Sequence, residues 1–407
     1  MTVLSGNVVF AQAASEPNSE GRLRVQMDRN YLRPITSEPE GIFGTIFPGL
    51  HGDEALHFDY AYTGGVFNNA RGGTQTKGAT SYLGIFDLGI TADTEKLGLW
   101  KNGSFYMHSF FSHGRSLSNN DVGDYQNVVV FDYDTPAQVA EYWYEHHFFG
   151  DTLGVRVGKM DAGTDFFYLD STENFINSSG TCVPVTGIPT TPANAWGVMT
   201  NVNVTKNLCF KFGLFDADAD ANQFWMSESG NVYTAYQFDL HYTLFRHLPG
   251  FAYIGAWYDN SGVECHRGHQ HSGDSGYAVG FEQMIYRTNY LKPGDLRGLT
   301  FFAQLGRPKT DRDSDLYRFY SFGWRWLGVF ENRPDDVLGF AVFKADFDKD
   351  LRANENLPFT SETAYELHYH AHIIDNIALQ PVFQYVVHPS GTNRNAFVPG
   401  LVFMVTF

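Results

Sequence analysis

The sequence predicts an all-β fold: a transmembrane, antiparallel β-barrel of about sixteen strands, with short turns at one rim and long loops at the other. Three observations lead to this prediction. Apolar and polar residues alternate along many segments, short and long connections alternate between those segments, and no apolar run approaches the roughly 18 residues of a membrane helix. Aromatic residues make up 16% of the 407 residues, more than a soluble core requires. A wall with hydrocarbon outside and water inside accounts for all of these patterns.

Segment 363–373 shows the alternation clearly. Tyr365 and Leu367 fall on one register, and Glu366 and His368 fall on the other. Successive side chains of a strand point to opposite faces, so one face here is aromatic and the opposite face is ionisable. A soluble sheet would bury the aromatic face and carry small solvated residues on the other. We therefore assign the aromatic registers to lipid and the opposite registers to the lumen.

The same pattern along the chain gives sixteen candidate strands, an even number typical of bacterial outer-membrane barrels. They span residues 55–67, 79–92, 103–114, 137–148, 152–160, 196–204, 208–216, 232–246, 251–259, 276–287, 298–307, 316–330, 337–346, 363–373, 377–388 and 396–407. The short turns are expected at the periplasmic rim and the long polar loops outside the cell. The last strand, with Phe403 and Val405 on one face, is expected to pair with the first, since lipid tolerates no open sheet edge.

The domain organisation expected is a single barrel over residues 54–407, because no linker or charge block divides this part of the chain. Residues 1–14 include Ala11-Gln12-Ala13, the small-x-small pattern at the end of a secretory signal, and we interpret them as a remnant of one. Residues 15–53 are expected to form a periplasmic arm or a plug.

The net charge of −17 disfavours nucleic acid as a partner, and no motif predicts a cofactor. Three cysteines do not make a disulfide scaffold, although a Cys182–Cys265 bridge is open if both lie in external loops. "GDSG" at 273–276 copies a protease nucleophile motif, but no partner His motif precedes it. Catalysis is not expected, and an outer-membrane enzyme such as a lipase is the alternative from another class.

Metal binding is considered at three places and predicted at none. "DADAD" at 216–220 lacks the Gly and terminal Glu of a calcium loop, and the imidazoles of 368–372 are interpreted as lumen lining. "ECHRGHQH" at 264–271 has irregular spacing, so a solvated loop is favoured there. Its weak candidate ligands are Cys265, His266, His269 and His271.

The inward registers supply the candidate site residues, which carry both signs of charge. They are Glu141, Trp143, Glu145, Arg156, Lys211, Asp239, Glu282, Arg325 and Glu366. Carboxylates and guanidinium groups make several hydrogen bonds to hydroxyls, and aromatic faces stack on the C–H side of a pyranose. This lining suits neutral sugars, and a general or differently selective porin is the alternative. Segment 161–192 is expected to dip inward, because it is long, aromatic and follows Arg156.

Several motifs, taken in order, resemble the carbohydrate-selective porin family (OprB-like) over about residues 52–407. They include "SHGRSLS", "YWYEHHFFGDTLGVRVGKMDAGTDF", "RPDDVLGFAVF", "ETAYELHY" and "LQPVFQYVVHPSG". The resemblance implies a barrel in a Gram-negative outer membrane that passes glucose and similar sugars by facilitated diffusion. It also implies contact with outer-membrane lipids and lipopolysaccharide, and leaves a monomer or a homotrimer open. The eyelet residues carried over by motif are Arg115, Glu141, Trp143, Glu145 and Arg156.

Overall fold

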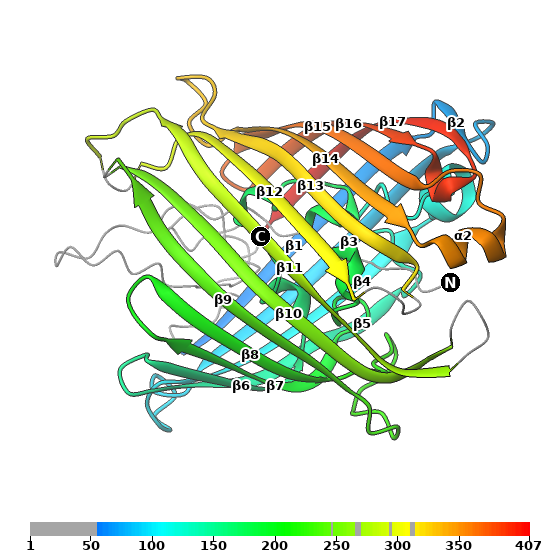
Figure 1. Ribbon diagram of the computed structural model, residues 1–407. Helices are drawn as coiled ribbons and strands as arrows, with labels where there is room; N and C mark the ends of the chain where they lie inside the picture. Colours follow the sequence, from blue (N-terminus) through cyan, green and yellow to red (C-terminus); the bar gives the residue numbers. More distant parts are fainter. Residues whose placement is uncertain (1–54, 246, 265–269, 293–294, 310–313) are drawn as a thin grey trace.

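The strands close into one barrel in the computed structural model, which describes residues 55–407 except 246, 265–269, 293–294 and 310–313 (Figure 1). All strand pairings between neighbours in the described sheet are antiparallel, and β1 (Leu56–Asn68) pairs with β17 (Arg394–Thr406) to complete the wall. Closure of the last strand on the first is therefore confirmed. The signal remnant and the arm or plug expected for residues 1–14 and 15–53 lie outside the described residues.

Sixteen of the described strands build the wall, and a further short strand, β2 (Arg71–Gly73), pairs with β17. Between β1 and β17, the wall strands are β3 (Thr80–Asp93), β4 (Gly103–Gly114), β5 (Ala137–Phe148), β6 (Leu153–Met160), β7 (Ala195–Asn203), β8 (Leu208–Asp216), β9 (Val232–Leu244), β10 (Leu248–Glu264), β11 (Gln270–Arg287), β12 (Gly298–Pro308), β13 (Leu316–Leu327), β14 (Val337–Phe347), β15 (Ser361–Ile374) and β16 (Ile377–Val387).

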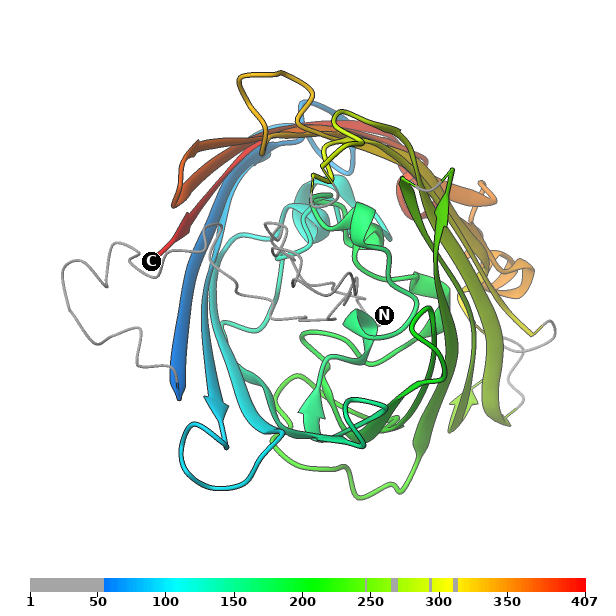
Figure 2. The ribbon, with the colours of Figure 1, turned by 90° about the vertical axis from the view of Figure 1, so that its left-hand side faces the viewer.

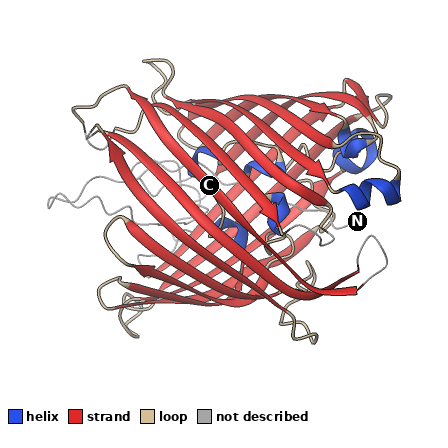
Figure 3. Ribbon diagram, in the orientation of Figure 1, coloured by secondary structure: helices blue, strands red, loops and turns tan. Residues whose placement is uncertain are grey.

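Helices are short and occur in the connections (Figure 3). Those in the described part of the chain are η1 (Ser118–Val122), η2 (Ala162–Thr164), η3 (Asp170–Thr172), η4 (Ser178–Gly180), η5 (Pro184–Thr186), α2 (Lys349–Glu355) and η6 (Pro389–Gly391). Among the described residues, no helix is long and apolar enough to cross a membrane.

All sixteen predicted wall strands are present, but the β10–β11 hairpin is longer than predicted. It continues to Glu264 and resumes at Gln270, through a region expected to be a long external loop. These strands have 17 and 18 residues, whereas about 9–11 residues cross the membrane. Their outer ends need no apolar register, so the alternation fades while the pairing continues. "GDSG" accordingly lies inside β11, where Ser275 pairs with Tyr258, and not at a loop-to-strand junction.

The facing of the side chains agrees with the predicted registers. On β9, Tyr236, Phe238 and Leu240 are 43–48% exposed on the outside of the barrel. Gln237 and Asp239, which alternate with them, are at most 1% exposed. A strand therefore presents an apolar surface outward and a polar surface inward, which is the arrangement that a membrane wall needs.

Two long connections fold into the barrel (Figure 2). Residues 161–194, here called the inner loop, join β6 to β7, and their inward course was expected for 161–192. Residues 115–136 join β4 to β5 and were predicted to be an external polar loop, which is wrong. Their apolar run Val128–Phe131 is at most 1% exposed, and Val130 N donates to Ile176 O of the inner loop at 2.8 Å. The two segments pack on each other, which gives this apolar run a dry environment.

Candidate functional site

Acidic side chains of the wall hold the backbone of the inner loop. The two carboxylate oxygens of Glu366 accept hydrogen bonds from Ile176 N and Asn177 N, each at 2.8 Å. Glu282 accepts one from Ser171 N, also at 2.8 Å. A carboxylate satisfies backbone N–H groups strongly, because the hydrogen bond is charge-assisted. Two residues predicted from their inward register are thus anchors of the inner loop.

Basic side chains of the wall reach the same loop. Lys211 Nζ donates to Asp165 O at 2.9 Å and lies 2.6 Å from Asp239 Oδ2, and both charged side chains are fully buried. Arg325 pairs with Glu173 of the inner loop at 2.9 Å. Burial raises the pKa of the Glu173 carboxyl to about 7, an effect that the attraction of Arg325 only partly offsets. The predicted cations are therefore paired, and they fix the loop from another side.

Wall glycines make room for this packing. At Gly306 of β12, an added Cβ would lie 2.5 Å from Val185 and 2.6 Å from Val183 of the inner loop. Real Cβ atoms do not approach other atoms so closely, so the loop could not pack here against a larger residue. The wall and the loop are complementary in shape as well as in charge.

Three wall residues of β5 and β6, Trp143, Glu145 and Arg156, meet Asp165 of the inner loop, and we call these four residues the arginine cluster. The guanidinium of Arg156 lies 3.0 Å from Glu145 and 2.7 Å from Asp165. Its central carbon lies 4.2 Å from the ring centroid of Trp143, a cation–π contact. β5 and β6 place Glu145 directly opposite Arg156 in the register. Three of the four residues were predicted, and Asp165 was missed because it lies in the loop.

Glu141 adjoins the arginine cluster. One of its carboxylate oxygens accepts hydrogen bonds from Asp161 N at 3.1 Å and from Trp143 Nε1 at 3.3 Å. Opposite it on β4, the ring of His108 lies 4.0 Å from Glu141 and is hydrogen-bonded to Asp87 at 2.9 Å. His108 was absent from the predicted site, although its inward register opposite Glu141 was a signal that could have found it.

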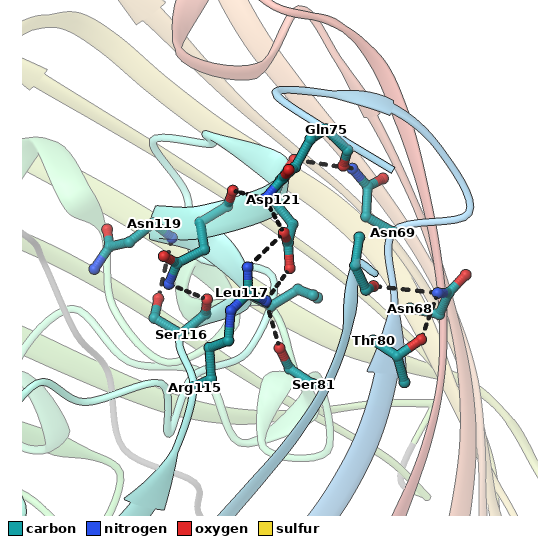
Figure 4. Close-up of polar contacts among 12 residues, drawn as sticks. Asn68, Asn69, Gln75, Thr80, Ser81, Arg115, Ser116, Leu117, Asn119 and Asp121 are labelled. Atoms are coloured by element: carbon teal, nitrogen blue, oxygen red, sulfur yellow. Dashed lines mark hydrogen bonds and ion pairs between the residues drawn. The ribbon is translucent and has the colours of Figure 1, made fainter. Parts of the chain in front are cut away.

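Arg115 lies apart from the arginine cluster. It follows the last residue of β4, where it bonds Asp121 at 2.8 Å and Ser81 at 3.2 Å (Figure 4). His108 lies beside Glu141 seven residues earlier on the same strand, a separation of about 20 Å. The structure therefore does not bring Arg115 together with the other eyelet candidates.

The histidines of β15 are held by polar neighbours. His368 Nδ1 lies 3.3 Å from Glu366 Oε1, and His370 Nδ1 lies 2.9 Å from Gln380 Oε1. Among the described residues, no group of three or more His, Cys, Asp or Glu side chains is arranged to hold a metal ion. The weak candidates Cys265, His266 and His269, and the side chain of His271, lie outside the described residues.

Cys182 is a free thiol inside the barrel, 6% exposed in the inner loop. Burial raises its pKa to about 12, so the thiol is unreactive while the loop is in place. The bridge to Cys265 required Cys182 to lie in an external loop, and that premise is wrong. Cys265 itself lies outside the described residues.

The sequence from residue 77 to residue 407 matches the model of the family described as "Carbohydrate-selective porin, OprB family". The chain belongs to the carbohydrate-selective porin family. It is 23% identical over 410 residues to Porin B of Pseudomonas aeruginosa, with 87% of this chain and 88% of that protein covered. This family consists of channels, and the match together with the barrel places the protein in the bacterial outer membrane.

Solved structures share the fold of this porin. The high-pH structure of Pseudomonas putida OprB has a TM-score of 0.79 at 22% identity, covering 87% of this chain and 94% of that one. The low-pH structure of the same protein has a TM-score of 0.58 at 19% identity, covering 89% of this chain and 96% of that one. At these identities the two structures support the barrel architecture alone.

Proposed function

We propose that this porin gives facilitated diffusion of carbohydrates, glucose and other mono- or small oligosaccharides, through a constriction lined by the arginine cluster. The observation that carries the proposal is the placement of Arg156, over the ring of Trp143 and between Glu145 and Asp165. Donors, acceptors and the exposed part of a half-buried aromatic ring lie side by side, which is what a sugar with hydroxyls on its edge and C–H groups on its faces can use.

The paired charges support passage of neutral solutes over ions. Arg156 is matched by two carboxylates, and Lys211 and Arg325 each have an acidic partner. Each of these cations is neutralised by a carboxylate, so they give the lumen no strong preference for anions. Hydrogen bonds to hydroxyls remain available at the edges of such pairs. Weak binding at several groups lets a solute enter and leave, as conduction requires.

Planar-bilayer recording tests this proposal. Glucose or maltose should reduce the ion current of the purified protein in a concentration-dependent way. Trp143→Leu, which removes the aromatic face, should weaken the block about tenfold, whereas Trp143→Phe should keep most of it. Arg115→Ala serves as the control, because Tyr106, the register partner of Trp143, is nine residues earlier in the chain, which is about 30 Å along the wall.

The alternatives give different recordings. Steps of conductance without any block by sugar would favour a general or differently selective porin. A preparation that is folded but gives no conductance steps would favour a barrel that is packed shut, as in an outer-membrane enzyme. Equal block in wild type, Trp143→Leu and Arg156→Ala would remove the arginine cluster from the transport path. Mass measurement in detergent would separate a monomer from a homotrimer.

A further inference from the structure

The connection between β8 and β9, residues 217–231, folds against the outside of the barrel, and we call it the strap. The ring of Phe224 is stacked on Tyr142, with centroids 4.6 Å apart and planes 18° apart. The ring of Trp225 lies 4.2 Å from that of Trp196. Tyr142 and Trp196 belong to the outward registers of β5 and β7, because along each strand they alternate with side chains that are buried inside the barrel. The strap therefore covers lipid-facing wall.

Polar groups of the outer wall satisfy the strap's backbone. Lys159 Nζ donates to Gln223 O at 2.6 Å, and Trp196 Nε1 donates to Phe224 O at 3.2 Å. Lys159 lies directly opposite Tyr142 in the register, hence on the outward face, yet it is only 2% exposed. An uncovered lysine on the lipid face of a barrel is destabilising. Irregular backbone at membrane depth likewise needs its carbonyl groups satisfied.

The contact lies at membrane depth. Lys159 is six residues from Leu153, where β6 leaves its short turn, so it stands about 20 Å along the strand. At the usual tilt of about 40° this is a height of roughly 15 Å, inside the apolar band of about 25 Å. β6, β7 and β8 have 8, 9 and 9 residues and are the shortest wall strands described. The strap therefore covers the part of the wall that has the shortest strands.

We propose that segment 224–226 of the strap is immersed in the outer leaflet and binds lipid acyl chains through Phe224, Trp225 and Met226. These side chains are 62%, 61% and 54% exposed. The rings of Phe224 and Trp225 contact Tyr142 and Trp196 of the wall on one side and leave their other side open. They continue the outward apolar surface formed by Val157 and Val198, which are about 40% exposed. Lys159 and the strap stabilise each other. The strap shields the ammonium group of Lys159 from lipid, and that group donates a hydrogen bond to the carbonyl of Gln223, which lipid could not do.

A fluorescent probe tests the depth of the strap. In a Cys265→Ser background, whose other two cysteines are buried, bimane is attached at Trp225→Cys and the protein is placed in liposomes. Val157→Cys provides the lipid-facing control, and Thr76→Cys provides an exposed control in another long connection. We expect a nitroxide on the lipid acyl chain to quench position 225 about as strongly as position 157, and at least threefold more strongly than position 76. Aqueous iodide should show the reverse order.

Two results would overturn the proposal. Iodide quenching at position 225 equal to that at position 76 would place the strap in water. Protection from both quenchers, with disulfide-linked dimers forming through position 225, would make the strap an interface with a second copy of the chain. Retained heat-modifiable mobility in gels shows that each variant is folded, and Met226→Cys replaces Trp225→Cys if that variant fails. Sugar block is recorded separately, so the strap is tested independently of the transport proposal.

Discussion

Replacing Glu366 by Ala should release the inner loop from the wall. The change removes the acceptors of two backbone hydrogen bonds, from Ile176 N and Asn177 N, at a side chain that is fully buried. Leaving a buried donor unsatisfied costs about 1–3 kcal/mol, so the two together cost about 2–6 kcal/mol. Since every 1.4 kcal/mol is about tenfold in an equilibrium, even the lower limit raises the open population of the loop about 30-fold.

The thiol of Cys182 reports this opening, because it is buried in the same loop. With Cys265 and Cys209 replaced by Ala, the rate at which the folded protein reacts with a thiol reagent measures the open fraction. Glu366→Ala should react at least about 30-fold faster than the parent. Glu366→Gln retains one acceptor oxygen and should fall between the two. Glu355→Ala, at an exposed glutamate of α2, is the control.

The reasoning would be refuted if Glu366→Ala and the parent reacted within a factor of two of each other. That result would mean that the remaining contacts of the loop hold it closed without Glu366. A rate in Glu366→Gln equal to that of Glu366→Ala would show instead that the negative charge carries the anchoring.

Three more predictions follow from the same packing. In the closed inner loop the pKa of Glu173 is about 7, above its ordinary 4.5. Closure of the loop is therefore favoured below about pH 4.5, and it loses about 3 kcal/mol of free energy as the pH rises through 7. The rate of thiol reaction of the parent, relative to that of Glu173→Gln, should rise roughly 100-fold from pH 5 to pH 8. Lys211→Met should lower the free energy of unfolding by about 3–5 kcal/mol, because it leaves Asp239 buried and unpaired, and Lys211→Met with Asp239→Asn should recover much of this loss in urea titrations. Gly306→Leu should clash with Val185 and cost about 1–3 kcal/mol in the same titrations; Gly306→Ala should cost less, and equal stability of all three proteins would contradict the close packing.

Part of the site followed from the sequence because it lies on paired strands. Glu145 and Arg156 stand on inward registers of two strands joined by a short turn, so their meeting at 3.0 Å could be anticipated from alternation. The partners of Glu366 and Glu282 could not, since Ile176 and Ser171 lie more than a hundred residues away and belong to a loop with no periodic pattern. The alternation predicts that these side chains point inward, but it does not predict the groups that they bind.

The wall itself was determined by the sequence alone. Water on one side and hydrocarbon on the other impose a two-residue period on every strand, and that period is local enough to be recognised in a single segment. Tertiary structure decided what fills and covers the wall: the inward course of 115–136, the lengthened β10–β11 hairpin, and the strap that hides Lys159. These features depend on shape and on buried polar groups finding partners between distant segments, and no local pattern of residues encodes such pairings.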